Sequence, residues 1–202
     1  MMLYSRHRTP QKKQIRIRYI VNRKQGKPAS LFALFLMEDC SYALFNAART
    51  GDAAGLNSIL REVVDINVRD AKGYTPLIIA SYNGNYEVTR LLLESGAEVN
   101  AQDSGGNTAL MGVSFRGFPE IADLLIEYGA DLNLQHGNGG TALMFAAMFG
   151  RNELVKLLIE RGADKDIRES RGLTAIDLAV QQGNVGAVEL LEAGEFSGSN
   201  GV

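Results

Sequence analysis

The chain has 202 residues, of which 46% are hydrophobic, and it contains 22 glycines but only 4 prolines. This composition is sufficient to bury a core and favours regularly spaced turns over a disordered chain. Cys40 is the only cysteine, which excludes an intramolecular disulfide and a thiolate metal cluster within one chain. No apolar stretch approaches the ~20 residues that a helix needs to span a bilayer.

The net charge of −2 conceals two segments of opposite charge. Residues 1–37 contain nine Lys or Arg and no Asp or Glu, so the rest of the chain holds 12 basic residues against all 23 acidic ones, a net charge of −11. Segments of opposite charge seldom serve one purpose. We therefore treat residues 1–37 as a basic leader that is separate from the body of the chain.

The basic leader leaves several interpretations open. Residues 14–20 alternate polar and apolar side chains, as a single strand does, but no second strand is evident to pair with them. The leader is interpreted as a disordered tail attracted to nucleic acid or anionic surfaces, as residues upstream of a native start at Met37, or as an Arg-rich targeting sequence. A signal peptide is disfavoured because Met-Glu-Asp-Cys follows the apolar stretch LFALFLM, where a small-residue cleavage site belongs.

The body of the chain repeats with a period of 33 residues. Four threonines are each 33 residues apart, within the segments GYTPLIIA, GNTALMGV, GGTALMFA and GLTAIDLA. Three further series keep the same step: Gly51, Gly84, Gly117, Gly150 and Gly183; Gly96, Gly129 and Gly162; and Asn67, Asn100, Asn133 and Asp166. A period of this length is typical of a solenoid of stacked units.

Each 33-residue unit is predicted to contain two short helices and an extended loop. Threonine is a good N-cap, and Pro76 directly after Thr75 occupies a helical position where its missing N–H costs nothing. The first helix is expected to run about nine residues and to end at a glycine, which permits a left-handed turn. Residues 86–94 are predicted to form a second helix because their apolar positions have helical spacing. Helices this short are marginal alone and need neighbouring units.

These motifs, Asp-x-x-Gly-x-Thr-Pro-Leu, Gly, Glu-Val-x-x-Leu-Leu-Leu and Gly-Ala-Asp-x-Asn, resemble those of the ankyrin repeat proteins. The resemblance covers about three-quarters of the chain and implies an all-α solenoid of helix-turn-helix units with projecting β-turn loops. We expect a small stand-alone member with about five repeats in residues 38–194, divided into 38–69, 70–102, 103–135, 136–168 and 169–194. The first of these is degenerate and the last truncated, and residues 195–202 are expected to form a flexible tail.

The chain departs from the family pattern at one position of each unit. Family repeats often have a histidine after Pro-Leu, and its ring joins neighbouring loops by hydrogen bonds. The corresponding residues here are Ile78, Met111, Met144 and Asp177. We therefore expect weaker polar contacts and more apolar contact between neighbouring loops.

The resemblance implies that a partner contacts the loop tips and the exposed ends of the first helices. Matching those positions predicts a set of partner-binding residues: Arg49, Lys72, Tyr82, Asn83, Phe115, Arg116, Met148, Phe149, Arg171 and Gln181. Four of them are predicted to form an apolar ladder bordered by Arg49 and Arg116: Tyr82, Phe115, Met148 and Phe149. Exposed aromatic, Met and Arg residues in one patch are favoured at interface hot spots. The alternative interpretation is that these side chains only cover gaps between first helices.

The sequence contains no motif for catalysis, a cofactor or a metal. His7 and His136 are far apart without metal-ligand spacing, and the loop at residues 137–140 lacks the Lys-Ser/Thr pair of a phosphate-binding loop. His136 is instead predicted to be a turn residue. Carboxylates recur at one position of each unit, which predicts a shared role in local loop bonds: Asp65, Glu98, Asp131 and Asp164.

The sequence therefore predicts a non-enzymatic, cytoplasmic and monomeric module that binds a protein through its concave face and loop tips, without a cofactor or metal. Because the body has a charge of −11, a basic patch on the partner is expected to be favoured on approach. The alternative hypothesis is a nucleic-acid-associated regulator that uses the basic leader. The identity of the partner does not follow from the sequence, because one scaffold serves many functions.

Overall fold

The computed structural model describes residues 31–61 and 65–193, with side chains described from Cys40 onward. The strand predicted at residues 14–20 and the tail predicted at 195–202 lie outside these ranges. The described residues form helices and no strands: α1 (Leu31–Thr50), α2 (Ala53–Ile59), α3 (Pro76–Tyr82), α4 (Tyr86–Glu94), α5 (Ala109–Arg116), α6 (Pro119–Glu127), α7 (Ala142–Met148), α8 (Asn152–Glu160), α9 (Ala175–Gln181) and α10 (Val185–Ala193). None of the helices in these ranges is long and apolar enough to cross a membrane.

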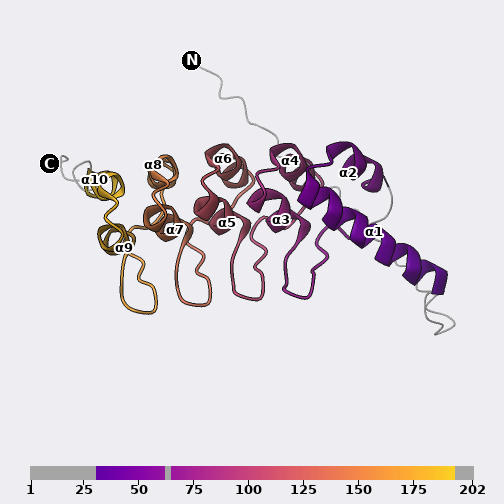
Figure 1. The fold of residues 1–202 in the computed structure, drawn as a ribbon, viewed down its shortest axis with the longest axis horizontal. Helices are drawn as coiled ribbons and strands as arrows, with labels where there is room; N and C mark the ends of the chain where they lie inside the picture. The colour runs from indigo at the N-terminus through magenta and orange to yellow at the C-terminus, as the bar shows by residue number, and fades with distance from the viewer. Residues whose placement is uncertain (1–30, 62–64, 194–202) are drawn as a thin grey trace, which may run out of the picture.

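The helices form two layers along the long axis of the molecule (Figure 1). The first helices α3, α5, α7 and α9 form the layer from which the loops project, and each packs against the next. The second helices α4, α6, α8 and α10 form the outer layer, also in sequence. This arrangement confirms the predicted all-α solenoid.

Threonine caps and glycine turns define the helix ends as predicted. The Thr75 hydroxyl accepts a hydrogen bond from the backbone N–H of Ile78 at 3.3 Å, and the other three threonines do the same in their units. The glycines of the two series after the helices have φ between 67° and 93°, the left-handed conformation that glycine adopts without strain. Helix α4 has the predicted bounds, whereas α3, α5, α7 and α9 have seven or eight residues instead of about nine.

Leucines at equivalent positions form a continuous core between the two layers. In the first helices, Leu44, Leu77, Leu110 and Leu143 are at most 1% exposed, and in the second helices Leu92, Leu125 and Leu158 are fully buried. Burying one such side chain contributes about 1.5–3 kcal/mol. Because this core is continuous from one unit to the next, each unit depends on its neighbours for stability.

The first helices pack closely because α1, α3, α5 and α7 have a small residue at one position of the period. Four of these residues are completely buried: Ala48, Ser81, Ser114 and Ala147. The equivalent residue of α9 is Val180, which is 62% exposed. In the described part of the chain, α9 packs against α7 and α10, and no helix covers the side on which Val180 lies.

Helix α1 differs from the other first helices in its length. It has 20 residues and begins at Leu31, so it runs across the boundary predicted between residues 37 and 38. Its C-terminal part packs against α2, α3 and α4, with Leu44, Ala47 and Ala48 in the core. The N-terminal part extends beyond the end of the stack (Figure 1).

Neighbouring loops are joined by two sets of hydrogen bonds. At the loop tips, backbone N–H groups of Ser104, Gly137 and Ser170 donate to the carbonyl oxygens of Lys72, Gly105 and Asn138 at 2.8–3.0 Å. Nearer the helices, the side-chain oxygens of Asn67, Asn100 and Asn133 accept from the backbone of the next unit at 2.8–2.9 Å. Polar contacts therefore connect the loops although Ile78, Met111 and Met144 are buried apolar residues.

The recurring carboxylates have the predicted role in loop structure. The side chains of Asp65, Asp131 and Asp164 each accept a hydrogen bond from the backbone N–H two residues later, at 2.8–3.0 Å. Such a bond stabilises the tight turn that directs the chain from the second helix into the loop. Three of the four predicted carboxylates are thus accounted for as structural groups.

Candidate functional site

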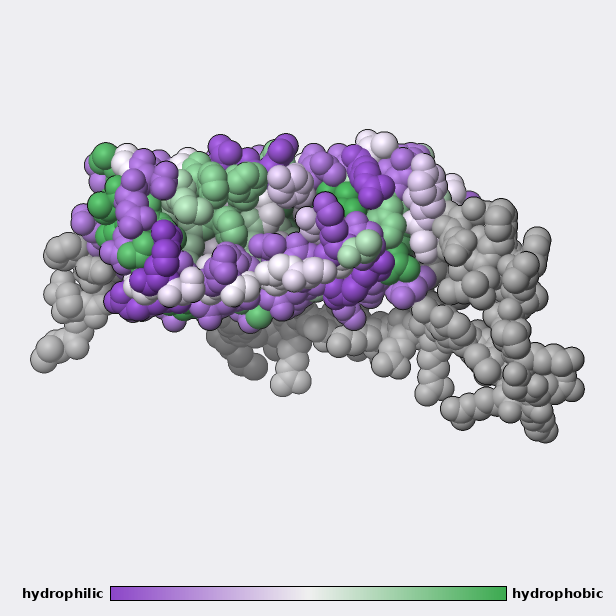
Figure 2. Space-filling view, turned by 60° about the horizontal axis from the view of Figure 1, so that its bottom comes forward, coloured by the Kyte–Doolittle hydropathy of each residue, from purple (hydrophilic) through white to green (hydrophobic). Residues whose placement is uncertain are grey.

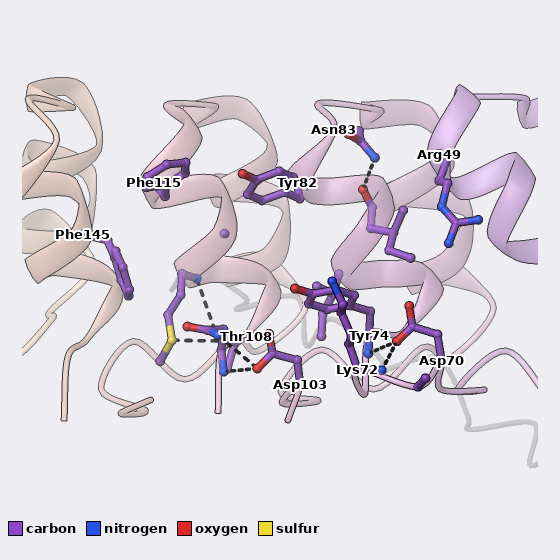
Figure 3. A pocket seen from close by; sticks show the side chains of 16 residues that line it. Arg49, Asp70, Lys72, Tyr74, Tyr82, Asn83, Asp103, Thr108, Phe115 and Phe145 are labelled. Carbon is purple, nitrogen blue, oxygen red and sulfur yellow. Dashed lines mark hydrogen bonds between the residues drawn. The ribbon is translucent and has the colours of Figure 1, made fainter. Parts of the chain in front are cut away.

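A cavity of about 880 Å³, which we call the groove, lies between the first helices and the loops of neighbouring units (Figure 3). Its walls come from the end of α1, from α3 and α5, from Phe145 of α7, and from the turns that begin at Asp70 and Asp103. On this face of the molecule, apolar areas are bordered by the mostly polar surface of the projecting loops (Figure 2).

Half of the sequence-predicted partner-binding residues line the groove. They are Arg49, Lys72, Tyr82, Asn83 and Phe115. The 33-residue period brings them together because it places equivalent positions of successive units side by side. Three of them, Tyr82, Asn83 and Phe115, are at the ends of first helices, while Lys72 rises from a loop tip (Figure 3).

The groove also has walls that the sequence analysis missed. Ile78, Ile79 and Met111 supply aliphatic surface, and Tyr74 and Phe145 supply two further rings. The signal for two of them was present, since Ile78 and Met111 are the apolar residues that replace the family histidine. Tyr74 and Phe145 occupy positions that do not share one residue type across the units, so the period did not single them out.

Three aromatic side chains form a row across neighbouring units, which we call the aromatic row: Tyr82, Phe115 and Phe149. The rings of Tyr82 and Phe115 are nearly parallel, with centroids 6.2 Å apart and 8° between planes. Phe149 meets Phe115 edge to face, with centroids 4.5 Å apart and 73° between planes. Tyr82 and Phe149 are 39% and 40% exposed, so each ring contacts solvent as well as Phe115.

Arginines border the aromatic row. The guanidinium carbon of Arg116 lies 5.1 Å from the ring centroid of Tyr82 and 5.6 Å from that of Phe118. Arg49 lies 5.8 Å from the ring of Phe45, one turn earlier in α1. Contacts of this kind contribute about 0.5–1 kcal/mol at exposed sites. These contacts place the Arg116 guanidinium beside the groove and the Arg49 guanidinium in its wall, and no hydrogen bond joins either guanidinium to another described residue.

A second, smaller pocket of about 330 Å³ lies between the next two loops. Met148 and Arg171 from the predicted set line it, together with His136. The His136 Nδ1 atom accepts a hydrogen bond from the backbone N–H of Asn138 at 2.9 Å, so this histidine holds a turn as predicted.

Glu169, in the same pocket, forms an ion pair with Arg171 at 3.2 Å. Burial raises the pKa of the Glu169 carboxyl, but the hydrogen bonds from Arg171 and from the N–H of Leu173 outweigh that effect and leave the pKa lowered. The Arg171 guanidinium therefore already has an anionic partner within the chain.

The remaining predicted residues lie outside both cavities. Arg116 and Phe149 lie beside the groove and contact its aromatic residues. Gln181 is exposed near the end of α9, away from the groove. Met148, which lines the second pocket, is the fourth member of the predicted apolar ladder. It is half-buried and packs against the core.

The two carboxylates of the groove are part of its turns. Asp70 accepts hydrogen bonds from the backbone N–H groups of Lys72 and Tyr74 at 2.9 and 3.0 Å. Asp103 accepts from Gly105 and Asn107 at 2.8 Å. Within the described residues, no group of three or more His, Cys, Asp or Glu side chains is arranged to hold a metal ion. The groove therefore offers apolar surface, hydrogen-bonding groups and cations for recognition.

Comparisons with known proteins agree with the repeat period and the helix pairs. A family model described as ankyrin repeats (3 copies) matches residues 44–136 and 110–198. The chain is similar to ankyrin repeat domain-containing protein 29 of Danio rerio, with 46% identity over 55 residues, which cover 27% of this chain and 18% of that protein. It is also similar to ankyrin repeat domain-containing protein 39 of Homo sapiens, with 38% identity over 58 residues, which cover 29% of this chain and 32% of that protein. The matched segments thus span about a third or less of these relatives.

Proposed function

The chain belongs to the ankyrin repeat proteins, and from this we propose that it binds a protein partner in the groove between its first helices and loops. Ankyrin repeats are protein–protein interaction modules and are generally non-enzymatic. The observation that carries the proposal is the aromatic row beside the groove, where Tyr82 and Phe149 are about two-fifths exposed. Aromatic and arginine side chains are enriched among interface residues with large energetic contributions.

The aromatic row is suited to binding because its side chains are already ordered. Each ring is held by its neighbour, and Arg116 packs over Tyr82. Immobilising a flexible side chain on binding costs about 0.5–1.5 kcal/mol, and rings in fixed positions avoid most of that cost. A partner that covers the row gains about 25 cal/mol for each Å² of apolar surface removed from water.

Affinity capture with the full-length chain tests the groove as the binding face. The groove variant carries Phe115→Ser and Phe149→Ser, and a matched control carries Tyr86→Ser and Tyr128→Ser, which remove two exposed rings from the outer layer. The wild type and the control are expected to retain the same proteins, and the groove variant is expected to lose them. Retention of every partner by a folded groove variant rejects the groove as the binding face.

The alternative function depends on the basic leader, most of which lies outside the described residues. Nine basic residues without an acidic one favour contact with nucleic acid. DNA binding at several salt concentrations, measured for the full chain and for a chain that begins at Met37, separates the two functions. DNA binding that requires the leader and falls steeply with salt supports the alternative function. Equal and weak DNA binding by both chains rejects it.

A further inference from the structure

The acidic excess of the body is concentrated on the outer layer of helices. Helices α3, α5 and α7 contain no carboxylate and one basic residue, Arg116. Helices α4, α6, α8 and α10 contain only Arg90 and Lys156 as bases, but they carry nine carboxylates: Glu87, Glu94, Glu120, Asp123, Glu127, Glu153, Glu160, Glu189 and Glu192. The outer layer faces away from the loops (Figure 1), so the net charge of −7 that its nine carboxylates and two bases carry is remote from the groove.

The cations beside the groove have no carboxylate partner. In the described part of the chain, the ion pairs involve Arg90, Lys156, Arg161 and Arg171. Arg49 and Lys72 line the groove and Arg116 borders it, and none of these three forms an ion pair with a described residue. All three are exposed, so their charge is available to a bound molecule.

The two carboxylates that line the groove are bonded to their own turns. The Oδ1 atoms of Asp70 and Asp103 each accept two hydrogen bonds from backbone N–H groups of the turn that contains them. Asn107 adds its side-chain amide to Asp103 at 3.0 Å. Hydrogen bonds to a carboxylate stabilise its negative charge where it is, so these groups are poorly placed to pair with a cation of a ligand. Three cations, Arg49, Lys72 and Arg116, against these two carboxylates give the groove and its border a net charge of +1.

From this distribution of charge we infer that the groove binds an acidic peptide segment of a partner protein, one that carries carboxylates beside an apolar side chain. The apolar side chain enters between Ile78, Met111 and the aromatic row, and the carboxylates meet Arg49 and Lys72. This inference rests on the proposed function and names the class of partner. It reverses the expectation from net charge, because the outer layer lies on the side of the first helices away from the loops, and salt screens its charges more than those that line the groove.

A nucleic acid fits this surface less well than a short acidic peptide. A polyanion extends along several phosphates, whereas the unpaired cations Arg49, Lys72 and Arg116 are confined to the groove and its border, so most of the phosphates would meet none of them. The aliphatic walls at Ile78, Ile79 and Met111 also offer no hydrogen-bond partner to a phosphate. A peptide with one apolar anchor instead packs against these walls and covers the exposed part of the Tyr82 ring.

Selection from a phage-displayed library of random 12-residue peptides tests the inference on the full chain. The library is first depleted on the Phe115→Ser, Phe149→Ser variant, so that the peptides retained afterwards require the aromatic row. The retained peptides are expected to carry a net negative charge and at least one Leu, Ile, Phe or Met. A net positive charge among them overturns the inference but leaves the proposed function in place. Failure to retain any peptide that requires the row counts against both.

Charge reversal at the groove then measures the electrostatic part of the affinity. A selected acidic peptide is expected to bind the Arg49→Glu, Lys72→Glu variant at least about tenfold more weakly than the wild type, and added salt is expected to weaken the wild-type complex. Lys156→Glu, in the outer layer, is the matched control and is expected to bind like the wild type. Equal binding by wild type and groove variant overturns the inference, as does displacement of the peptide by a 20-nucleotide single-stranded DNA at physiological salt.

Discussion

The ring of Tyr82 lies parallel to the ring of Phe115 in the next unit, 8° from coplanar and with 6.2 Å between centroids. The two residues are 33 positions apart, so the repeat geometry itself brings their rings into the same orientation. Phe149 is one position beyond the next equivalent, and its ring accordingly meets Phe115 at 73°. The equivalent residue, Met148, packs partly into the core instead. A one-residue offset thus changes a parallel contact into an edge contact.

Replacing Phe115 by serine is expected to have a modest effect on stability. The ring is half-buried, and an aromatic pair is worth about 0.5–1.5 kcal/mol beyond the area that it buries. Leu110→Ala, at a position 1% exposed in the same helix, is the comparison and is expected to cost about 2–5 kcal/mol. Urea denaturation followed by circular dichroism measures both. Equal losses in the two variants place the Phe115 ring in the core and contradict the binding interpretation.

Replacing Asn100 by alanine is expected to weaken the contact between two units. Its side-chain oxygen accepts from the backbone N–H of Asp131 at 2.8 Å, and its amide donates to the carbonyl of Gly129 at 3.1 Å. Removing both bonds is expected to lower the free energy of unfolding by about 1–3 kcal/mol. Asn57→Ala, in exposed α2, has no described side-chain bond to lose and is the control. The hypothesis fails if the two variants unfold at the same urea concentration.

Two glycines with the same backbone conformation are expected to respond differently to alanine. Gly129 has φ of 88° and open space around an added Cβ, so Gly129→Ala costs only the left-handed conformation, about 1–2 kcal/mol. Gly106 has φ of 83°, but its Cβ would lie 3.0 Å from the backbone nitrogen of Gly137 in the next loop. Gly106→Ala is therefore expected to lower the melting temperature more. Equal melting temperatures of the two variants would show that the loop at Gly137 moves to accommodate the added Cβ without loss of stability.

Asp177 is expected to make part of the stability depend on pH. The backbone N–H and then the hydroxyl of Thr174 donate to its carboxylate at 2.9 and 2.8 Å, and both bonds lower the pKa of Asp177. Its folded pKa is below the unfolded value of about 3.9, so its contribution is complete above that value and is lost as pH falls through the folded pKa. The Asp177→Asn variant should have a lower melting temperature than the wild type at pH 7. The difference between the two melting temperatures should disappear below about pH 4. A difference that stays constant from pH 7 to pH 3 contradicts this account.

The local features of the fold could be predicted because they depend on single residues. The four threonines that precede the first helices cap them through the same local bond, and the glycines of the two series that follow helices all have positive φ. Equivalent positions also lie side by side, which is why Tyr82 and Phe115 meet. These relations require only the period and the chemistry of the residues that recur.

The structural features that the sequence did not predict lie at positions where the other units have no matching residue. The start of α1 at Leu31 lies in a segment without the period, and Tyr74 and Phe145 occupy positions where other units have other residues. The sequence also did not predict that acidic and basic side chains lie on different surfaces, because the net charge counts charged residues without regard to the helix layer that contains them. Carboxylates of the second helices and cations beside the groove are interleaved along the chain but lie on different surfaces.

The exposure of Val180 marks α9 and α10 as the helix pair that is expected to unfold locally before the pairs inside the stack. Every first helix from α1 to α7 has its small residue sealed by the next helix, whereas α9 and α10 pack on one side only in the described part of the chain. A pair with one neighbour opens at a lower free energy than a pair with two. Amide hydrogens of α10 should therefore exchange with solvent sooner than those of α6 and of α5, the helix that contributes Met111 and Phe115 to the groove.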